Sequence, residues 1–291
     1  MFAATPVIHP EVFVQIPASL WKTGRHMSVL EGPSFDRDGN LYVVNVFYGQ
    51  VFRISPAGDV ALIAEYDGEP NGLKIHKDGR IFIADHRLGL VQLDAATGKV
   101  SVVMNRAQHE PLRGLNDLVF NSAGDLYFTD QGESDLRNPN GRVWVRRADG
   151  RLQLVLDNAP SPNGIVVTPD DRFLYLAVTR ANAVWRVPMR RDGTLGRVGT
   201  WLQLSGGAGP DGMALDESGG IAVAHAGMGS VWLFNDRGRL VAEIPAPEGR
   251  MTTNVAFGGG DRRTLYITEA DTHTVLIARL PTPGQALYSH A

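Results

Sequence analysis

The chain has 291 residues, of which 43% are hydrophobic and 20% are charged, and its formal net charge is -3. This balance is ordinary for a globular protein and gives no reason to expect a polyanionic partner, so nucleic-acid binding is not predicted. The absence of cysteine excludes disulfides, a thiolate nucleophile and cysteine-based zinc or iron–sulfur sites. Any metal must therefore be held by oxygen or histidine ligands.

The N-terminal residues 1–17 lack the basic start and apolar core of a signal peptide, and no run of about 18 apolar residues could cross a bilayer. We therefore expect a cytoplasmic protein without a membrane partner. The 33 glycines and 17 prolines fall mostly between short apolar segments. This distribution is typical of an all-β chain with many turns.

The first predicted element is a strand at residues 11–16, which ends at Pro17 and belongs to no repeat. A loop follows at residues 21–29 and includes His26, which we expect at the wall of a pocket, as we do His86. From residue 31 onward, a motif recurs in which a polar residue, often preceded by proline and followed by glycine, stands directly before a short apolar run. The polar residues of this motif, called axis residues below, are Glu31, Asn71, Asn116, Asn163, Asp211 and Asn254.

Successive axis residues are 40, 45, 47, 48 and 43 positions apart. A period of this length is expected for a β-propeller blade rather than for a helical repeat. Six repeats predict one closed domain over residues 1–291, in which six axis residues meet at one central channel.

Each repeat contains further apolar segments that we interpret as the remaining strands of its blade. The second strands are predicted at 41–44, 81–84, 126–129, 174–177, 221–224 and 265–268. The third strands are predicted at 51–54, 90–93, 143–145, 184–187, 231–234 and 275–277. The outer strands are predicted at 60–64, 100–104, 152–156, 198–204 and 240–244, which leaves the last outer position for residues 11–16. The sequence thus predicts an all-β six-bladed β-propeller with four antiparallel strands per blade, closed by its N-terminal strand, and a tail or cap at 281–291.

In an antiparallel blade the second strand ends where the first begins, so the residues after each second strand should lie at the same face as the axis residues. These residues are Asn45, Asp85, Asp130, Val178, His225 and Glu269. We therefore expect two polar rings at this face. Carboxylates crowded into a channel repel one another and lose hydration unless they bind protons or a cation. Carboxylate and amide oxygens suit a hard divalent ion, and calcium more than magnesium because the site is wide and flexible.

The alternative interpretation of the motifs is purely structural. Asn-Gly and Asp-Gly pairs are among the commonest turn formers, so one motif alone indicates no site. Turn formation does not explain Glu31, because glutamate is a poor turn residue. It also does not require a carboxylate or amide side chain at the start of every inner strand.

Laid out in this way, the chain resembles the SMP-30/gluconolactonase/LRE family of six-bladed propellers over about residues 30–280. The motifs that carry the resemblance are Leu30-Glu31-Gly32-Pro33, Leu115-Asn116-Asp117-Leu118, Tyr127-Phe128-Thr129-Asp130, Ser161-Pro162-Asn163-Gly164 and Gly209-Pro210-Asp211-Gly212-Met213. The resemblance implies a metal site at Glu31, Asn163 and Asp211, with Asn116 as a further contact near metal or substrate. It also implies hydrolysis of sugar-acid lactones.

Three positions depart from the family pattern. Phe35 stands where another aromatic residue commonly follows the Glu-Gly-Pro motif, and Gln131 stands where many relatives carry proline. Arg113 is one residue further from Asn116 than the substrate-binding arginine of some members. The identity of the substrate therefore stays open.

The resulting hypothesis is a gluconolactonase-like hydrolase of cyclic carboxylic esters. The metal would bind the lactone carbonyl oxygen and hold the attacking water, and Asp211 would be both a metal ligand and the general base. Calcium is favoured, with magnesium, zinc, manganese and iron(II) as alternatives. Further substrate contacts are expected from Asn116, Arg113, Asn71 and His225.

Two other functions are compatible with the same residues. One is a calcium-dependent phosphotriesterase or arylesterase, since more distant relatives of the family share the central-calcium design. The other is a non-catalytic propeller that serves as a binding platform around a structural metal. We expect a small-molecule lactone as partner, and a monomer or small homo-oligomer.

Overall fold

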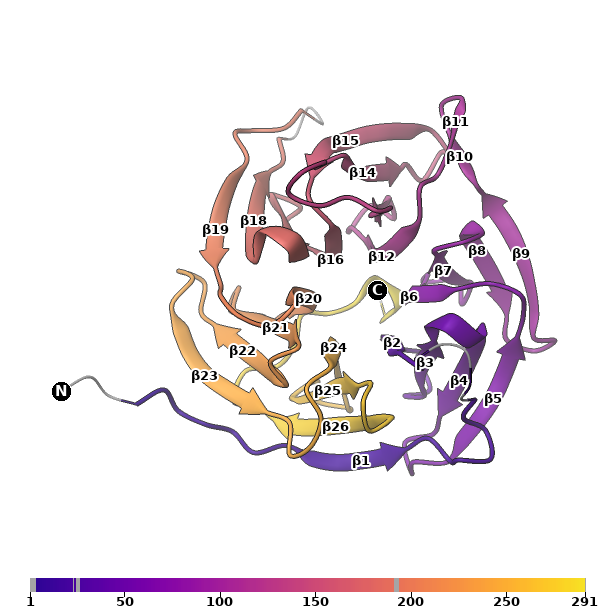
Figure 1. Cartoon of the computed structure of the whole chain (residues 1–291), viewed down its shortest axis with the longest axis vertical. Helices are drawn as coiled ribbons and strands as arrows, with labels where there is room; N and C mark the ends of the chain where they lie inside the picture. Colours follow the sequence, from indigo (N-terminus) through magenta and orange to yellow (C-terminus); the bar gives the residue numbers. More distant parts are fainter. Residues whose placement is uncertain (1–3, 23, 25–26, 191–193, 291) are drawn as a thin grey trace.

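The computed structural model describes residues 4–22, 24, 27–190 and 194–290, and His26 lies outside them. Within the described residues, six four-stranded antiparallel sheets are arranged around a central axis (Figure 1). The predicted all-β six-bladed propeller is thereby confirmed.

The strands of each blade follow one another in the chain from the axis outward, except that the last blade takes its outer strand from the N-terminus. Blade 1 consists of β2 (Leu30–Phe35), β3 (Leu41–Asn45), β4 (Gln50–Ile54) and β5 (Val60–Glu65). Blade 2 consists of β6 (Pro70–Ile75), β7 (Ile81–Asp85), β8 (Gly89–Asp94) and β9 (Lys99–Met104). Blade 3 consists of β12 (Leu115–Phe120), β13 (Leu126–Asp130), β14 (Gly141–Arg146) and β15 (Leu152–Ala159).

The other three blades have the same order. Blade 4 consists of β16 (Pro162–Val167), β17 (Phe173–Val178), β18 (Ala183–Pro188) and β19 (Gly199–Gln203). Blade 5 consists of β20 (Gly209–Leu215), β21 (Ile221–Ala226), β22 (Ser230–Phe234) and β23 (Leu240–Pro245). Blade 6 consists of β24 (Thr252–Gly258), β25 (Thr264–Glu269), β26 (Thr274–Arg279) and β1 (Glu11–Gln15).

Short elements of the described residues also lie outside the blade strands. A two-stranded hairpin, β10 (Arg106–Ala107) with β11 (Glu110–Pro111), follows β9. The 3-10 helices are η1 (Val46–Tyr48), η2 (Thr179–Ala181) and η3 (Tyr288–His290). Among the described residues, no helix has the length and apolar character needed to span a bilayer.

The hydrophobic core lies between neighbouring blades. All residues of the second strand β3 are buried, as are those of β7 and β13. Val44 of blade 1 packs in one cluster with Ile83 of blade 2, and Val43 packs in another with Val275 of blade 6. Because each second strand is covered on both faces, its side chains are apolar without alternation, which is the pattern seen in the sequence.

The N-terminal segment closes the ring and also joins two blades. Strand β1 pairs antiparallel with β26, as predicted. Residues before β1 run along blade 5, where Ile8 N donates to the carbonyl of Glu243 at 2.8 Å and Glu243 N donates to the carbonyl of Pro6 at 2.9 Å. The segment therefore pairs with the outer strand β23 of blade 5 and itself forms the outer strand of blade 6, which covers the edges of β23 and β26.

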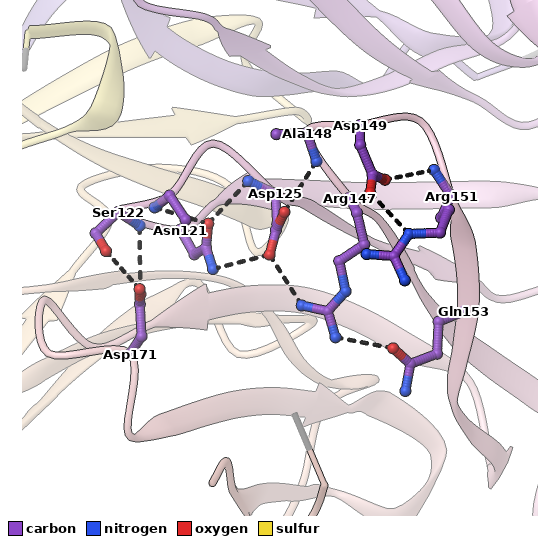
Figure 2. A network of polar contacts seen from close by, with 10 residues as sticks. Asn121, Ser122, Asp125, Arg147, Ala148, Asp149, Arg151, Gln153 and Asp171 are labelled. Carbon is purple, nitrogen blue, oxygen red and sulfur yellow. Dashed lines mark hydrogen bonds and ion pairs between the residues drawn. The ribbon is translucent and has the colours of Figure 1, made fainter. Parts of the chain in front are cut away.

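We call the face with the turns between first and second strands the turn face, and the opposite one the site face. Figure 2 shows a polar network at the turn face between blades 3 and 4. The carboxylate of Asp125 accepts a hydrogen bond from Arg147 Nη1 at 2.9 Å, and Asp171 accepts from Ser122 N at 3.3 Å. The network fixes the turn of blade 3 against that of blade 4.

The C-terminal tail, residues 281–290, crosses the turn face, and its end lies near the centre of the ring (Figure 1). Gln285 N donates to the carbonyl of Leu215 at 2.9 Å, and its Nε2 donates to the carbonyl of Val167 at 3.1 Å. The ring of Tyr288 lies 5.3 Å from that of Phe120, in a stacked arrangement. The tail also contacts blades 1, 2 and 6, through Arg37, His76 and Arg262. It therefore binds all six blades from the side opposite the axis residues, as a cap.

We predict that Tyr288→Ala lowers the free energy of unfolding by about 2 kcal/mol, because it removes a partly buried aromatic contact of the tail with blades 2 and 3. Urea denaturation measures this change. As the matched control, Leu136→Ala should alter stability by less than about 0.5 kcal/mol, because that side chain is 67% exposed. Equal stabilities of the two variants would contradict a stabilising role of the tail.

Candidate metal centre and active site

A bulge directs each axis residue. In all six blades the regular pairing of first and second strand is interrupted at the motif, for example between Glu31 and Ser34 and between Pro210 and Met213. A bulge adds a residue on one strand and changes the direction of its side chain, and bulges are frequent beside active sites. The repeated motif therefore marks the positions of six bulges in the innermost strands of the blades.

Glycines after the axis residues let the inner strands approach one another closely. A Cβ on Gly212 would lie 1.9 Å from Oδ1 of Asn254, and one on Gly164 would lie 2.3 Å from the carbonyl oxygen of Asp211. A side chain cannot fit at either position without displacing the next blade. The glycines thus keep neighbouring axis residues in contact around the channel.

Glu31 is 4% exposed and is held by two donors. Its Oε2 accepts from Gly32 N at 2.7 Å and from Asn254 Nδ2 at 2.8 Å. Burial raises the pKa of Glu31 to about 7, against the opposing effect of these hydrogen bonds, and the charge of Asp117 raises it further. The predicted ring member Asn254 therefore contacts the predicted ligand Glu31.

Asp211 is partly buried and lies within electrostatic range of two other carboxylates. Burial raises the pKa of Asp211 well above its usual value, and the charges of Glu31 and Asp117 raise it further. A hydrogen bond from the Asn163 side chain acts in the opposite direction. The structure therefore places the predicted ligands Glu31 and Asn163 close enough to Asp211 to act on it, the first through its charge and the second through a hydrogen bond.

Asp117 and Lys74 belong to this group, although sequence reasoning did not assign them to the site. Asp117 is 2% exposed, its Oδ1 accepts from Leu118 N at 2.8 Å, and Lys74 Nζ lies 3.9 Å from the same oxygen. Burial raises the pKa of Asp117, and the ammonium group of Lys74 lowers it. The sequence contained one signal for Asp117. It directly follows the axis residue Asn116, whereas four of the six axis residues are followed by glycine.

The other predicted axis residues are amides. Asn116 and Asn163 are each 6% exposed, and Asn71 is partly buried. Asn116 Nδ2 donates to Gln131 Oε1 at 3.3 Å, and the carbonyl of Asn163 accepts from Thr129 Oγ1 at 3.0 Å. The contact of Asn116 lies within blade 3, whereas that of Asn163 joins blades 3 and 4 at the site face.

The carboxylates of the predicted second polar ring bind backbone groups. Asp85, Asp130 and Glu269 do end their strands at the site face, but backbone N–H groups of their own blades bind their carboxylates. Asp130 Oδ1 accepts from Arg113 N at 2.6 Å and Gly114 N at 3.0 Å. Asp85 Oδ2 accepts from Glu69 N at 2.9 Å, and Glu269 Oε1 accepts from Met251 N at 3.0 Å. Each carboxylate thus fixes the loop that leads into the first strand of its blade.

His225 also has partners on both ring nitrogens. Trp232 Nε1 donates to Nδ1 at 3.0 Å, so the second contact, 3.0 Å from Nε2 to the carbonyl of Gly206, requires a proton on Nε2. Burial lowers the pKa of His225, and the neutral tautomer satisfies both contacts. These hydrogen bonds give His225 a structural role. Its role as a substrate contact stays a prediction.

Arg113 lies at the site face with a side chain that is 37% exposed. Its Nη1 donates to the carbonyl of Asn140 at 2.6 Å, and its Nη2 lies 3.8 Å from Glu110 Oε2. His86 lies beside the same loop, because a Cβ on Gly114 would be 2.4 Å from its ring. Both residues thus border the segment that leads to Asn116.

The donor set fits a hard divalent cation. The described residues contain no group of three or more His, Cys, Asp or Glu side chains placed to hold a metal ion. The predicted set instead pairs two carboxylates, Glu31 and Asp211, with the amides of Asn163 and Asn116. Carboxylates that are buried together and repel one another are stabilised by a bound cation, and their oxygen atoms match calcium or magnesium.

Comparisons with known proteins agree with this architecture. Residues 29–271 match the family described as the SMP-30/Gluconolactonase/LRE-like region. Lactonase drp35 of Staphylococcus aureus (strain USA300) is 32% identical over 268 residues, covering 86% of this chain and 81% of that protein. The calcium-binding protein regucalcin from Agrobacterium tumefaciens superposes with a TM-score of 0.82 at 23% identity, with full coverage of both chains. A gluconolactonase from Xanthomonas campestris superposes with a TM-score of 0.78 at 23% identity, covering 94% of this chain and 95% of that one. The chain belongs to the SMP-30/gluconolactonase/LRE-like family.

Proposed function

We propose that this protein is a metal-dependent lactonase that hydrolyses a sugar-acid lactone or a related small lactone, with calcium as the favoured cation. The observation that carries the proposal is the presence of two carboxylates, Glu31 and Asp211, at the channel axis, where burial raises the pKa of both and the charge of Glu31 raises that of Asp211 further. A bound cation would stabilise the ionised form of each. The similarity to lactonase drp35 supports the choice of substrate class.

Glu31, Asp211 and Asn163 would hold the cation, with Asn116 as a further contact. When bound, a divalent cation would stabilise negative charge on the carbonyl oxygen of the lactone and favour the ionised forms of both carboxylates. The carboxylates and amides of the chain supply the remaining steps.

Asp211 is the proposed general base. Its carboxylate takes a proton from the water molecule that attacks the carbonyl carbon of the lactone. The bond between that carbon and the ring oxygen then breaks, and the proton returns to the ring oxygen as it leaves. The product is the open-chain hydroxy acid, so that one water molecule has been added and nothing else is consumed.

The neighbouring residues orient the reacting groups. The hydrogen bond of Asn163 to Asp211 favours the ionised carboxylate, which is the form that accepts a proton. Asn254 and Gly32 hold Glu31 in place. Asn116, Asn71 and Arg113 are proposed substrate contacts at the site face. A cytoplasmic location and a monomer or small homo-oligomer remain predictions from the sequence.

Removal of metal should abolish hydrolysis. We expect protein treated with chelator and freed of metal to show no proton release with aldonolactones or simple lactones, and calcium to restore the rate. An aryl ester and an organophosphate belong in the same panel, because faster turnover of either would favour the esterase or phosphotriesterase alternative. Undiminished lactone turnover in metal-free protein would overturn the proposal.

Asp211→Asn should lower kcat by about 100- to 10,000-fold, the range for loss of a general base, while thermal unfolding shows that the fold is retained. Asp149→Asn is the matched control, because Asp149 is an exposed turn residue paired with Arg151. This control should leave the rate unchanged. A fully active Asp211→Asn variant would place the base elsewhere.

The stability of metal-free protein should fall between about pH 5 and pH 8. In the folded protein Glu31 keeps its proton up to a pKa of about 7, whereas the unfolded chain releases it near 4.5, so the folded state binds more protons in this window. The contribution of Glu31 to the free energy of unfolding is therefore fully present below its unfolded-state pKa of 4.5. It decreases by about 3 kcal/mol as the pH rises through its folded-state pKa of about 7. Asp211 acts in the same direction.

Urea denaturation of metal-free protein across this pH range measures the effect. Glu31→Gln is the control, and its curve should lack the part that Glu31 contributes. Calcium should restore stability at pH 8, because it binds the ionised carboxylates of the folded state. Identical pH profiles of the wild type and Glu31→Gln would show that Glu31 has an ordinary pKa.

A further inference from the structure

Gln131 stands directly after β13, at the position where the sequence departs from the family pattern. Its backbone is fixed on both sides, because Gln131 N donates to the carbonyl of Gly114 at 2.8 Å and its own carbonyl accepts from Ser134 Oγ at 2.6 Å. The side chain therefore starts from a fixed point beside the segment that contains Asn116.

The amide of Gln131 connects two blades. Its Oε1 accepts from Asn116 Nδ2 at 3.3 Å, and its Nε2 donates to Ser161 Oγ at 2.8 Å. Asn116 is the axis residue of blade 3, and Ser161 stands two residues before Asn163, the axis residue of blade 4. One side chain thus contacts the segments that present two of the proposed ligands.

The segment at Ser161 is held in an unusual conformation. Ser161 has a φ of 63°, in the left-handed region that non-glycine residues seldom adopt. Ser161 N donates to Ser134 Oγ at 2.9 Å, so the hydroxyl of Ser134 joins the backbones of Gln131 and Ser161. The side-chain and backbone contacts together form one network between the blades.

We propose that Gln131 is a positioning residue that fixes the orientation of the Asn116 amide and thereby presents its oxygen to the cation and substrate at the axis. An asparagine amide has a donating and an accepting end, and only the oxygen can bind a cation. Because Gln131 Oε1 binds the NH₂ group, Oδ1 is the end left outside this contact. The role in catalysis rests on the proposed lactonase function, whereas the orientation of Asn116 does not.

Gln131→Met tests this role, because methionine has a similar length and cannot accept the hydrogen bond. We expect calcium affinity, measured by isothermal titration calorimetry, and kcat/KM for the lactone each to fall about ten-fold, as for other residues that orient metal ligands. Gln131→Glu keeps an acceptor for Asn116, and the hydroxyl of Ser161 can rotate to donate. This variant should stay within about three-fold of the wild type.

Gln203→Met is the matched control. Gln203 Nε2 binds the carbonyl of Asn182 at 3.0 Å on the outer strand of blade 4, away from the axis. Its replacement should leave calcium affinity and kcat/KM unchanged. An equal loss in Gln203→Met and Gln131→Met would show that a general weakening of the fold causes the effect, and would overturn the proposal.

A double-mutant cycle separates positioning from a purely structural role. If Gln131 acts through Asn116, then Gln131→Met should have no further effect on calcium affinity in an Asn116→Ala background. Independent, multiplying losses would overturn the proposal.

The orientation itself can be measured without metal or substrate. In metal-free wild type, the side-chain NH₂ signals of Asn116 should be protected from hydrogen exchange, and Gln131→Met should remove this protection while Gln131→Glu retains it. Equal protection in Gln131→Met and the wild type would refute the proposal. A wild type that hydrolyses no lactone would overturn the proposed function alone, because the NMR result still decides the role of Gln131.

Discussion

The repulsion among three acidic side chains at the channel axis is the constraint on which the other features of the site depend. Glu31, Asp117 and Asp211 come from three different blades, and burial raises the pKa of each. Lys74 and the amides of Asn163 and Asn254 offset part of this repulsion, and the proposed cation would offset more of it. The bulges direct these residues inward, and the glycines beside them remove the side chains that would keep the blades apart.

The fold could be predicted in full outline because its repeat has a physical cause. The second strands are covered on both faces, so each blade repeats a similar apolar run at nearly the same distance from its axis residue. Two features had no such signal. The pairing of the N-terminal segment with blade 5 rests on the backbone of Pro6 and Glu243, and the path of the tail rests on isolated contacts such as that of Tyr288 with Phe120. Contacts made once leave no periodicity in the sequence.

The candidate site could be predicted in part. Sequence spacing located the axis residues, because a polar residue at the start of every inner strand marks the channel. The direction of a side chain at a strand end could not be inferred in the same way. Asp130 lies at the correct face, yet the N–H groups of Arg113 and Gly114 bind its carboxylate. Asp117 was missed because it takes a glycine position of the repeat, and Lys74 because it lies within an apolar strand.

The C-terminal tail has a consequence for how molecules reach the axis. Gln285 and Tyr288 form part of the wall of a cavity of about 210 Å³ that Ser34 and Lys74 also line, at the end of the channel opposite the axis residues. Because the tail lies across that end, a molecule that approaches the axis from the turn face must pass the tail, whereas one that approaches from the site face does not.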